Sequence, residues 1–383
     1  MIKSLWIDNF KSLVDFDLDL AKLSCLVGLN GAGKSTVLQA MDFLSQLMVG
    51  DLDDWLQQRQ WDSADINSKL TKKSNIDFKL VVDLAEFGEV VWSGSINRKT
   101  LRCSQERVED KHRVLLRVDG NECLLREPMN FRKGAVFTEK FSIVFEYQGS
   151  ILSSLKDKQT NALLQALKTA ILDIRSLDLL SPELLRSRAK TSQGKLGLGG
   201  QRLSAFIHES GDEGREQLKQ ALKCVYQQLE SVDTRSLRSG WKQLEITEKF
   251  EGHILKSSAR HINDGMLRLM AILTQLSDGN AFLLFDEIEN GINAELIEFL
   301  IDHLVATKHQ VLVTTHSPMI LNFLEDSVAV ESVIYLYKNS QGFTRSIKFF
   351  NIPSMAEKLK FMGVGEVFID TDLTQLYQEI ELL

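Results

Sequence analysis

The sequence contains one stretch from which the rest can be organised, Gly28-Leu-Asn-Gly-Ala-Gly-Lys-Ser-Thr36. It fits the phosphate-binding pattern Gly-x-x-x-x-Gly-Lys-Ser/Thr at every fixed position. The apolar run 23–27 before it has the character of a β-strand, and the residues after it repeat apolar side chains at helical spacing, at Leu38, Met41, Leu44 and Met48. The flanks therefore predict the strand, loop and helix that this motif requires. The alternative, a chance glycine turn before a helix, explains fewer of these positions.

Each residue type in the loop has its own chemical task. Glycines let the backbone curl until successive N–H groups point inward at a phosphate, and the following helix adds its positive N-terminal end. Lys34 is expected to reach the β- and γ-phosphates and to act in catalysis, and Ser35 is expected to offer its hydroxyl to Mg²⁺. The predicted nucleotide contacts in the loop are Asn30, Gly31, Ala32, Gly33, Lys34, Ser35 and Thr36.

Composition places the chain among ordinary globular proteins. Its 383 residues suffice for one large α/β domain with insertions or for two lobes. Apolar residues make up 44% and charged residues 25%, which argues against long disorder. The net charge of -7 gives no overall attraction to nucleic acid, so any contact with DNA would require a local basic patch.

Cysteines and hydropathy indicate the compartment. The four cysteines are far apart and show no spacing of a zinc or redox motif, which favours a reduced protein. The first residues carry charges throughout, and no apolar run approaches the length of a membrane span. We therefore expect a cytoplasmic protein without a membrane segment, which excludes a transporter subunit with its own channel.

The first part of the chain has a sequence pattern that predicts β-strands. Residues 2–20 alternate in polarity and predict two strands joined through Asn9-Phe-Lys-Ser12. The pair Asp119-Gly120 signals a hairpin within an antiparallel sheet beside the nucleotide-binding core. The strands expected in that sheet are 77–84, 89–96, 113–118, 122–126 and 141–147.

The middle of the chain, from 153 to about 230, has helical periodicity. It is interrupted by a glycine-rich loop, 191–200, that follows a small basic cluster of Arg186, Arg188 and Lys190. This loop is either a binding loop near a nucleotide or DNA, or a plain solvated loop. Strands are expected again at 281–285, 310–315, 333–337 and 344–349, and a mostly helical tail from 355, apart from 363–370.

A second chemical motif follows the apolar strand 281–285, which ends in Asp286 and Glu287. A buried strand would deliver Asp286 to the edge of a sheet, where it can hold Mg²⁺ together with Ser35. Glu287 could polarise the attacking water as a general base. The alternative is a strand that merely stops at a polar turn, which is less favoured beside a complete phosphate loop.

A third motif follows the apolar strand 311–315, which leads to His316. A helix with the apolar face Ile297, Leu300, Ile301 and Leu304 lies between this strand and Asp286. Strand, helix and strand at this spacing predict a parallel crossover, with both strand ends at one edge beside the phosphate loop. His316 is then expected to bond the γ-phosphate, although an isolated histidine is more often structural.

These motifs, in this order, resemble the ATP-binding-cassette (ABC) ATPases of the RecF/SMC type. The resemblance extends to Asn9-Phe-Lys-Ser-Leu13 and Asp286-Glu-Ile-Glu-Asn-Gly291, which stand-alone ATPases of that kind share. It is strong over about 1–50 and 255–325 and weak over 60–250. It implies an α/β P-loop NTPase of the ABC head type, with a mixed central sheet, an antiparallel β flank and a helical insertion. The cofactors implied are ATP and Mg²⁺, and the activity is that of an ATPase.

The resemblance also implies a second copy of the chain. Heads of this family sandwich ATP between the phosphate loop of one copy and a signature segment of the other. Asn263-Asp-Gly265 occupies the place of that segment, with Asn263 where a serine is usual, and Asn290 resembles the loop at the dimer interface. Asn263, Gly265, Asn290 and Lys11 complete the nucleotide contacts that the resemblance implies.

We divide the chain into an N-terminal lobe at 1–150, a helical insertion at 151–250 and a C-terminal lobe at 251–383. The pair Asp370 and Asp372 resembles the acidic pair of a Toprim nuclease, but too few residues follow for that domain. The leading hypothesis is a homodimeric ATPase switch that controls a separate effector, a toxin or nuclease, in bacterial antiviral defence. The alternatives are an ATP-dependent DNA clamp in repair or segregation, and a scaffold that binds ATP with low turnover.

Overall fold

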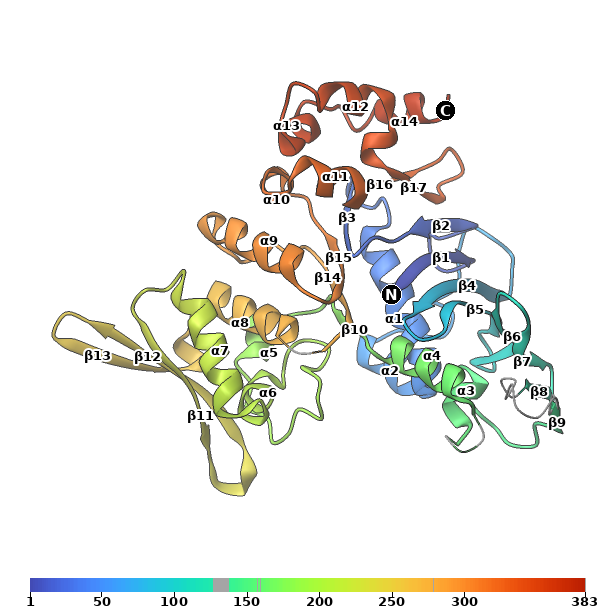
Figure 1. The fold of residues 1–383 in the computed structure, drawn as a ribbon, viewed down its shortest axis with the longest axis horizontal. Helices are drawn as coiled ribbons and strands as arrows, with labels where there is room; N and C mark the ends of the chain where they lie inside the picture. The colour runs from blue at the N-terminus through green and yellow to red at the C-terminus, as the bar shows by residue number, and fades with distance from the viewer. Residues whose placement is uncertain (127–137, 157, 159, 278, 383) are drawn as a thin grey trace. The chain divides into compact units, whose positions relative to one another are not determined.

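The computed structural model describes residues 1–126, 138–156, 158, 160–277 and 279–382 (Figure 1). The chain forms two compact units, each assembled from separate stretches of sequence. The first unit combines Met1–Arg175, Val330–Ala356 and Asp372–Leu383, and the second combines Ser176–Ala329 and Glu357–Thr371. The phosphate loop therefore belongs to the first unit and the Asp286 motif to the second. The division at 150 and 250 stays a prediction.

The first unit contains an antiparallel sheet in the order β2-β1-β4-β5-β6-β7-β8-β9. Its strands are β1 (Ile2–Asp8), β2 (Phe16–Asp19), β4 (Asn75–Leu84), β5 (Gly88–Asn97), β6 (Arg102–Asp110), β7 (Val114–Asp119), β8 (Glu122–Arg126) and β9 (Thr138–Ser142). The antiparallel flank predicted from the alternating sequence is confirmed, as is the hairpin after Asp119, which pairs with Glu122.

Two strands of this sheet differ from the prediction. β6 was not expected because its inward positions are Cys103, Glu106 and Val108, and a carboxylate at the centre hides the alternation. Glu106 is buried, accepts hydrogen bonds from Trp92 Nε1 and the Ser150 hydroxyl, and has a pKa that burial raises. The strand expected at 141–147 was wrong, because β9 ends at Ser142 and the run beyond it includes a side chain that is 91% exposed, Val144.

The phosphate loop of the first unit lies between β3 (Leu23–Val27) and α1 (Lys34–Val49), as predicted. β3 is buried along its length and pairs in parallel with β16 (Val333–Lys338). β16 then forms an antiparallel hairpin with β17 (Thr344–Lys348), which confirms the hairpin expected there. The other helices of this unit are α2 (Leu52–Arg59), α3 (Ile151–Ser154), α4 (Ala162–Leu172) and α14 (Leu376–Ile380).

A buried ion pair ties α2 to α1. Asp42 accepts hydrogen bonds from Arg59 Nη2 at 2.7 Å and from Trp55 Nε1 at 2.7 Å, and both charged side chains are at most 5% exposed. Asp42→Ala should lower the free energy of unfolding by about 3–5 kcal/mol, because it leaves a guanidinium buried without its carboxylate. Chemical denaturation checks this value. The exposed Asp19→Ala serves as a control and should stay within about 0.5 kcal/mol of the native chain.

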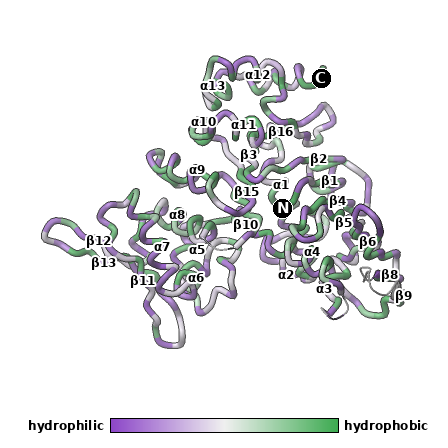
Figure 2. Tube along the Cα trace, in the orientation of Figure 1, coloured by the Kyte–Doolittle hydropathy of each residue, from purple (hydrophilic) through white to green (hydrophobic). Residues whose placement is uncertain are grey.

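The second unit joins helices to two groups of strands. Its elements are α5 (Pro182–Leu185), α6 (Leu203–Glu209), α7 (Gly211–Lys223), β11 (Leu229–Ser236), β12 (Lys242–Phe250), β13 (His253–Ser258), α8 (Asp264–Leu276), β14 (Phe282–Phe285), α9 (Ile297–Ala306), β15 (Gln310–Thr314), α10 (Pro318–Asn322) and α13 (Val364–Ile369). Figure 2 shows a hydrophobic α8 and a mainly hydrophilic α7. The antiparallel sheet β11-β12-β13 was not expected.

The parallel crossover predicted from the sequence is confirmed within the second unit. β14 pairs in parallel with β15, and Phe285 lies opposite Val313 near the carboxyl ends of both strands. α9 connects them and buries Ile297, Leu300, Ile301 and Leu304, the face that the periodicity predicted. The residues that follow the two strands therefore emerge at the same edge.

The prediction for the tail was wrong at 363–370, which contains the helix α13. The glycines of this stretch suggested a break, but Gly365 lies where α13 meets α10. A Cβ atom at Gly365 would lie 2.4 Å from the Pro318 carbonyl oxygen, so close packing explains the glycine. Three short elements cross the boundaries between the units: β10 (Ile174–Leu177), α11 (Asp326–Ser332) and α12 (Pro353–Lys358). Across the described residues, no helix has the length and apolar character to cross a membrane.

Candidate functional site

The phosphate loop in the first unit has a backbone that requires its glycines. Gly28, Gly31 and Gly33 have φ of 143°, 77° and 113°, values that side chains rarely allow. A Cβ atom at Gly28 would lie 2.3 Å from the Leu336 carbonyl oxygen, and one at Gly33 would lie 2.4 Å from the Thr344 hydroxyl. The loop is therefore pressed against β16 and β17, which fixes its shape before any ligand binds.

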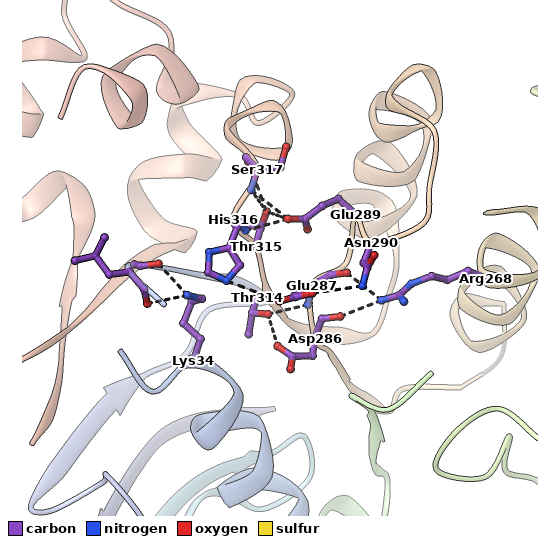
Figure 3. A network of polar contacts seen from close by, with 12 residues as sticks. Lys34, Arg268, Asp286, Glu287, Glu289, Asn290, Thr314, Thr315, His316 and Ser317 are labelled. Carbon is purple, nitrogen blue, oxygen red and sulfur yellow. Dashed lines mark hydrogen bonds and ion pairs between the residues drawn. The ribbon is translucent and has the colours of Figure 1, made fainter. Parts of the chain in front are cut away.

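The side chains of this loop are arranged for an anion. Lys34, the first residue of α1, is 6% exposed, and its Nζ donates to the carbonyl oxygens of Gly28 at 2.8 Å and Leu29 at 3.1 Å (Figure 3). Asn30, Gly31 and Ser35 are exposed, whereas Ala32 is buried. A buried ammonium at the start of a helix, next to open backbone N–H groups, can bind a phosphate.

Two residues outside the loop support it. The Thr344 hydroxyl lies 2.9 Å from the Ala32 carbonyl oxygen and 2.8 Å from the Ser12 hydroxyl. Ser12 belongs to the Asn9-Phe-Lys-Ser-Leu13 motif, so this motif is linked to the phosphate loop through Thr344. No sequence pattern identifies Thr344, which reaches the loop only through the pairing of β17 with β16.

Lys11, which precedes Ser12 in that motif, lies beside α1. Its Nζ donates to Gln39 Oε1 at 2.9 Å and lies 3.2 Å from the centre of the Trp61 ring. Gln39 is one turn after Ser35, so Lys11 lies beside the first turns of the helix. The backbone of Lys11 has φ of 48°, in the left-handed region, and its N–H is bonded to the Ile66 carbonyl oxygen. Trp61 was not foreseen, and the sequence offers no pattern that would identify it.

In the second unit, Asp286 and Glu287 follow β14 directly (Figure 3). The Thr314 hydroxyl donates to Asp286 Oδ1 at 2.5 Å and accepts from the Glu287 N–H at 2.8 Å. Arg268 Nη2 donates to the carbonyl oxygens of Asp286 at 3.0 Å and Glu287 at 2.9 Å. These bonds hold Glu287 at φ 44°, a left-handed conformation that costs on the order of 1–3 kcal/mol and occurs often at functional sites.

Glu289 organises the segment that carries His316. Its Oε1 accepts from the Thr315 hydroxyl at 2.9 Å, the His316 N–H at 2.9 Å and the Ser317 N–H at 3.1 Å (Figure 3). The imidazole of His316 then lies near the general-base candidate, with Nε2 3.9 Å from Glu287 Oε1. The motif Asp286-Glu-Ile-Glu-Asn-Gly291 contained Glu289, but sequence reasoning gave it no role.

The signature segment also belongs to the second unit. Asn263 caps α8, and its Oδ1 accepts from the Met266 N–H at 2.7 Å. A Cβ atom at Gly265 would lie 2.7 Å from the Gly291 carbonyl oxygen, so the segment lies against the loop that contains Asn290. The Asn290 amide donates to Glu287 Oε2 at 3.4 Å. Burial lowers the pKa of Arg268 in the same helix, and the nearby carboxylates act in the opposite direction.

Among the described residues, no group of three or more His, Cys, Asp or Glu side chains forms a closed metal site. Asp286 and Ser35 offer a carboxylate and a hydroxyl, the hard oxygen donors that suit Mg²⁺ with water and phosphate completing its shell. These donors lie in different units. The acidic pair of the tail has other partners: Asp370 pairs with Lys358 at 2.9 Å, and Asp372 accepts from the Thr374 N–H at 2.9 Å.

Solved structures with a similar fold are heads of SMC proteins. An Smc head bound to the C-winged-helix domain of ScpA is 13% identical, with a TM-score of 0.55, over 90% of this chain and 97% of that chain. An Smc head domain with an extended coiled coil, bound to the C-terminal domain of ScpA from Pyrococcus furiosus, is 11% identical, with a TM-score of 0.52, over 94% and 99%. At these identities the likeness shows the fold alone.

A curated relative matches only a short part of the sequence. The OLD nuclease of Thermus scotoductus is 48% identical over 52 residues, which is 14% of this chain and 9% of the nuclease. The match thus spans less than a tenth of that relative.

Family models match most of the chain. Residues 227–322 match the family described as "AAA domain, putative AbiEii toxin, Type IV TA system". Residues 1–264 match the family described as "AAA ATPase domain", and this match includes the phosphate loop. With this match over most of its length and a complete phosphate loop, the chain belongs to the AAA ATPase domain family, and its fold is similar to that of SMC heads.

Proposed function

We propose that the protein binds and hydrolyses ATP with Mg²⁺ and acts as a switch that controls a partner. The observation that carries the proposal is the phosphate loop, whose glycines at positive φ and buried Lys34 suit the binding of an anion. Within it, the N–H groups of residues 30–36 surround the phosphates, and Lys34 exchanges its two carbonyl partners for phosphate oxygens. Mg²⁺ supplies charge neutralisation at the phosphates when it is bound, and the Ser35 hydroxyl and the Asp286 carboxylate are each the kind of oxygen ligand that suits it.

Glu287 is the proposed general base, and the carboxylate accepts a proton from the attacking water. Its backbone is held by Thr314 and Arg268, which limits the freedom of the side chain. His316 contributes an N–H toward the γ-phosphate, and Glu289 orients it through the backbone N–H. In this arrangement, Thr314, Arg268 and Glu289 are positioning residues.

A second copy of the chain completes the site in this proposal. Asn263, Gly265 and Asn290 are close together in one unit, so a partner could present all three as one surface. The packing of Gly265 against the Gly291 carbonyl oxygen keeps the start of α8 beside the loop that contains Asn290. ATP would then join two heads, and hydrolysis would separate them.

The separation of the heads is proposed to control a separate toxin or nuclease in bacterial antiviral defence. The support for this role is the match to a family described as a putative toxin of a toxin–antitoxin system and the short match to a nuclease. The test is recovery of tagged Glu287→Gln chain from its native cells, with and without ATP and Mg²⁺. A second protein in a fixed ratio supports the effector role. DNA retained only with ATP, without a protein partner, would instead support the alternative function, an ATP-dependent DNA clamp.

Lys11 and Trp61 provide a direct signal of ATP binding. We expect Lys11 to turn from the Trp61 ring to the phosphates, which removes a cation from the face of the indole and changes its fluorescence. Lys11→Ala should weaken ATP binding roughly tenfold, because a hydrogen bond to a charged group contributes about 1.5–3 kcal/mol. Fluorescence titration with ATP measures both effects.

The matched controls for this signal are two tryptophan variants. Trp61→Phe should abolish the ATP-dependent change in fluorescence, and Trp241→Phe, in the second unit, should leave it intact. An unchanged signal in Trp61→Phe would show that Lys11 does not move as proposed.

A further inference from the structure

The second unit contains a basic surface that ATP hydrolysis does not use. The stretch 186–202 contains five cationic residues and no Asp or Glu, and the stretch 234–243 contains three cationic residues and no Asp or Glu. The eight are Arg186, Arg188, Lys190, Lys195, Arg202, Arg235, Arg238 and Lys242. The whole chain has a net charge of -7, so this local concentration of positive charge is opposite in sign to the net charge.

The two stretches meet in the fold. The N–H of Lys242, the first residue of β12, donates to the Ala189 carbonyl oxygen at 2.8 Å. This contact closes a groove of about 460 Å³, lined by Arg188, Ala189, Lys190, Thr191, Gln193, Gln201, Arg202 and Trp241. We call it the Trp241 groove. Positive charge from one stretch and an aromatic ring from the other thus face the same space.

The walls of the Trp241 groove are held in place without a ligand. Arg202 Nη1 donates to the Ser192 carbonyl oxygen at 3.2 Å and to Gln193 Oε1 at 3.0 Å. The nearby Glu209 uses both carboxylate oxygens to accept hydrogen bonds from Ser192. The Ala189 N–H is fixed by the Ser204 hydroxyl at 3.1 Å. The shape of the groove is therefore set by these hydrogen bonds. The Glu209 carboxylate is paired with Ser192 rather than with the cations of the groove.

Two exposed cations remain available to a ligand. Arg188 and Lys190 are exposed, and Lys190 Nζ lies 5.5 Å from the centre of the Trp241 ring. Arg186 differs, because it donates to the Ile262 carbonyl oxygen and to Asp264. Lys242 donates to the Ser236 hydroxyl at 2.8 Å. Arg188 and Lys190, with support from Arg202, can thus contact phosphates.

Trp241 identifies the class of ligand. Its side chain is 41% exposed, although an indole gains more than most side chains from burial. An exposed aromatic face beside cations is the arrangement with which proteins bind single-stranded nucleic acid, with bases stacked on the ring and phosphates paired with the cations. A duplex keeps its base faces stacked inside and cannot offer them to Trp241.

We propose that the Trp241 groove binds single-stranded nucleic acid, with one base stacked on Trp241 and the adjoining phosphates on Arg188 and Lys190. The site is separate from the phosphate loop and needs no ATP. It gives the ATPase a means of sensing exposed single strands, the kind of signal that a switch could act on.

The experiment measures the fluorescence anisotropy of a labelled oligothymidine of about 15 nucleotides with the full chain and no nucleotide. We expect the logarithm of the association constant to fall with the logarithm of salt concentration with a slope of about -1.4, since about two phosphates, on Arg188 and Lys190, are neutralised at about -0.7 each. Trp241→Leu should weaken binding about tenfold or more, and Trp241→Phe should restore most of it. Arg188→Glu with Lys190→Glu should reduce binding to background.

Matched variants control for net charge and for surface aromaticity. Lys256→Glu with Lys308→Glu makes the same change of charge at exposed positions outside the groove, and Phe250→Leu removes an exposed ring at the end of β12. Both should bind the oligonucleotide as the native chain does. Circular dichroism and thermal melting establish that each variant is folded.

Three results would overturn the proposal. One is a duplex of the same length that competes as well as the single strand, and another is a mononucleotide that displaces it at similar concentration. The third is an equal loss of affinity in the matched control variants. These results would show, in turn, that the groove is a general cationic surface, that it is a small-molecule site, or that binding does not depend on the groove.

Discussion

Glu287→Gln is expected to lower the rate of ATP hydrolysis by roughly 10²–10⁴-fold while ATP binding is retained. The amide keeps the shape of the side chain but cannot accept the proton of the attacking water. The backbone contacts to Thr314 and Arg268 involve main-chain atoms of Glu287, so the substitution leaves them in place. The measurement is phosphate release under saturating ATP and Mg²⁺, with ATP binding followed separately.

The same variant should also hold two chains together. If hydrolysis separates the heads, a chain that binds ATP without hydrolysing it accumulates as the closed pair. Size-exclusion chromatography with light scattering should then give twice the monomer mass with ATP and the monomer mass without it. Glu298→Gln, an exposed carboxylate of α9, is the matched control and should hydrolyse ATP at the native rate. Normal turnover by Glu287→Gln would rule out Glu287 as the base.

Lys34→Ala is expected to abolish measurable ATP binding, with a loss of affinity of roughly 100-fold or more. Two charge-assisted hydrogen bonds to phosphate are lost, and each contributes about 1.5–3 kcal/mol. Isothermal titration with ATP and Mg²⁺ measures the affinity. Lys22→Ala, an exposed lysine of the same unit, should bind ATP normally.

Stability must be measured alongside, because Lys34 also has a structural role. In the ligand-free chain its ammonium satisfies the carbonyl oxygens of Gly28 and Leu29. Lys34→Met keeps the aliphatic volume and should lose ATP binding to the same extent with a smaller change in melting temperature. Retained binding in Lys34→Met would show that the ammonium is not the phosphate ligand.

The sequence predicted local elements where side-chain pattern and turn chemistry agree. β3, the glycine loop and α1 were foreseen because the motif prescribes backbone conformation, and β14, α9 and β15 because their apolar faces are continuous. β6 was missed because Glu106, a buried carboxylate with its own donors, occupies an inward position. The helix α13 was missed because Gly365 is required by packing on α10, a contact distant in sequence.

The residues of the candidate site could likewise be predicted only in part from the sequence. The residues proposed to carry chemistry, such as Lys34 and Glu287, lie in recognisable motifs. The residues that position them, Thr344, Arg268 and Glu289, act through contacts that depend on which strands pair and which helix packs nearby. Trp61 and Trp241 were also missed, because an aromatic residue in a loop has no periodicity that distinguishes it from a core side chain.

In the proposed mechanism, Lys34 binds the phosphates of ATP and Glu287 activates the water that hydrolyses it. The measurement that tests it most directly is phosphate release from ATP and Mg²⁺ by the native chain, Lys34→Met and Glu287→Gln, with ATP retention measured on the same samples. We predict turnover only in the native chain, ATP retained by the native chain and Glu287→Gln, and neither property in Lys34→Met. A native chain that retains ATP but releases no phosphate above the Lys34→Met background would contradict the account and leave an ATP-dependent scaffold.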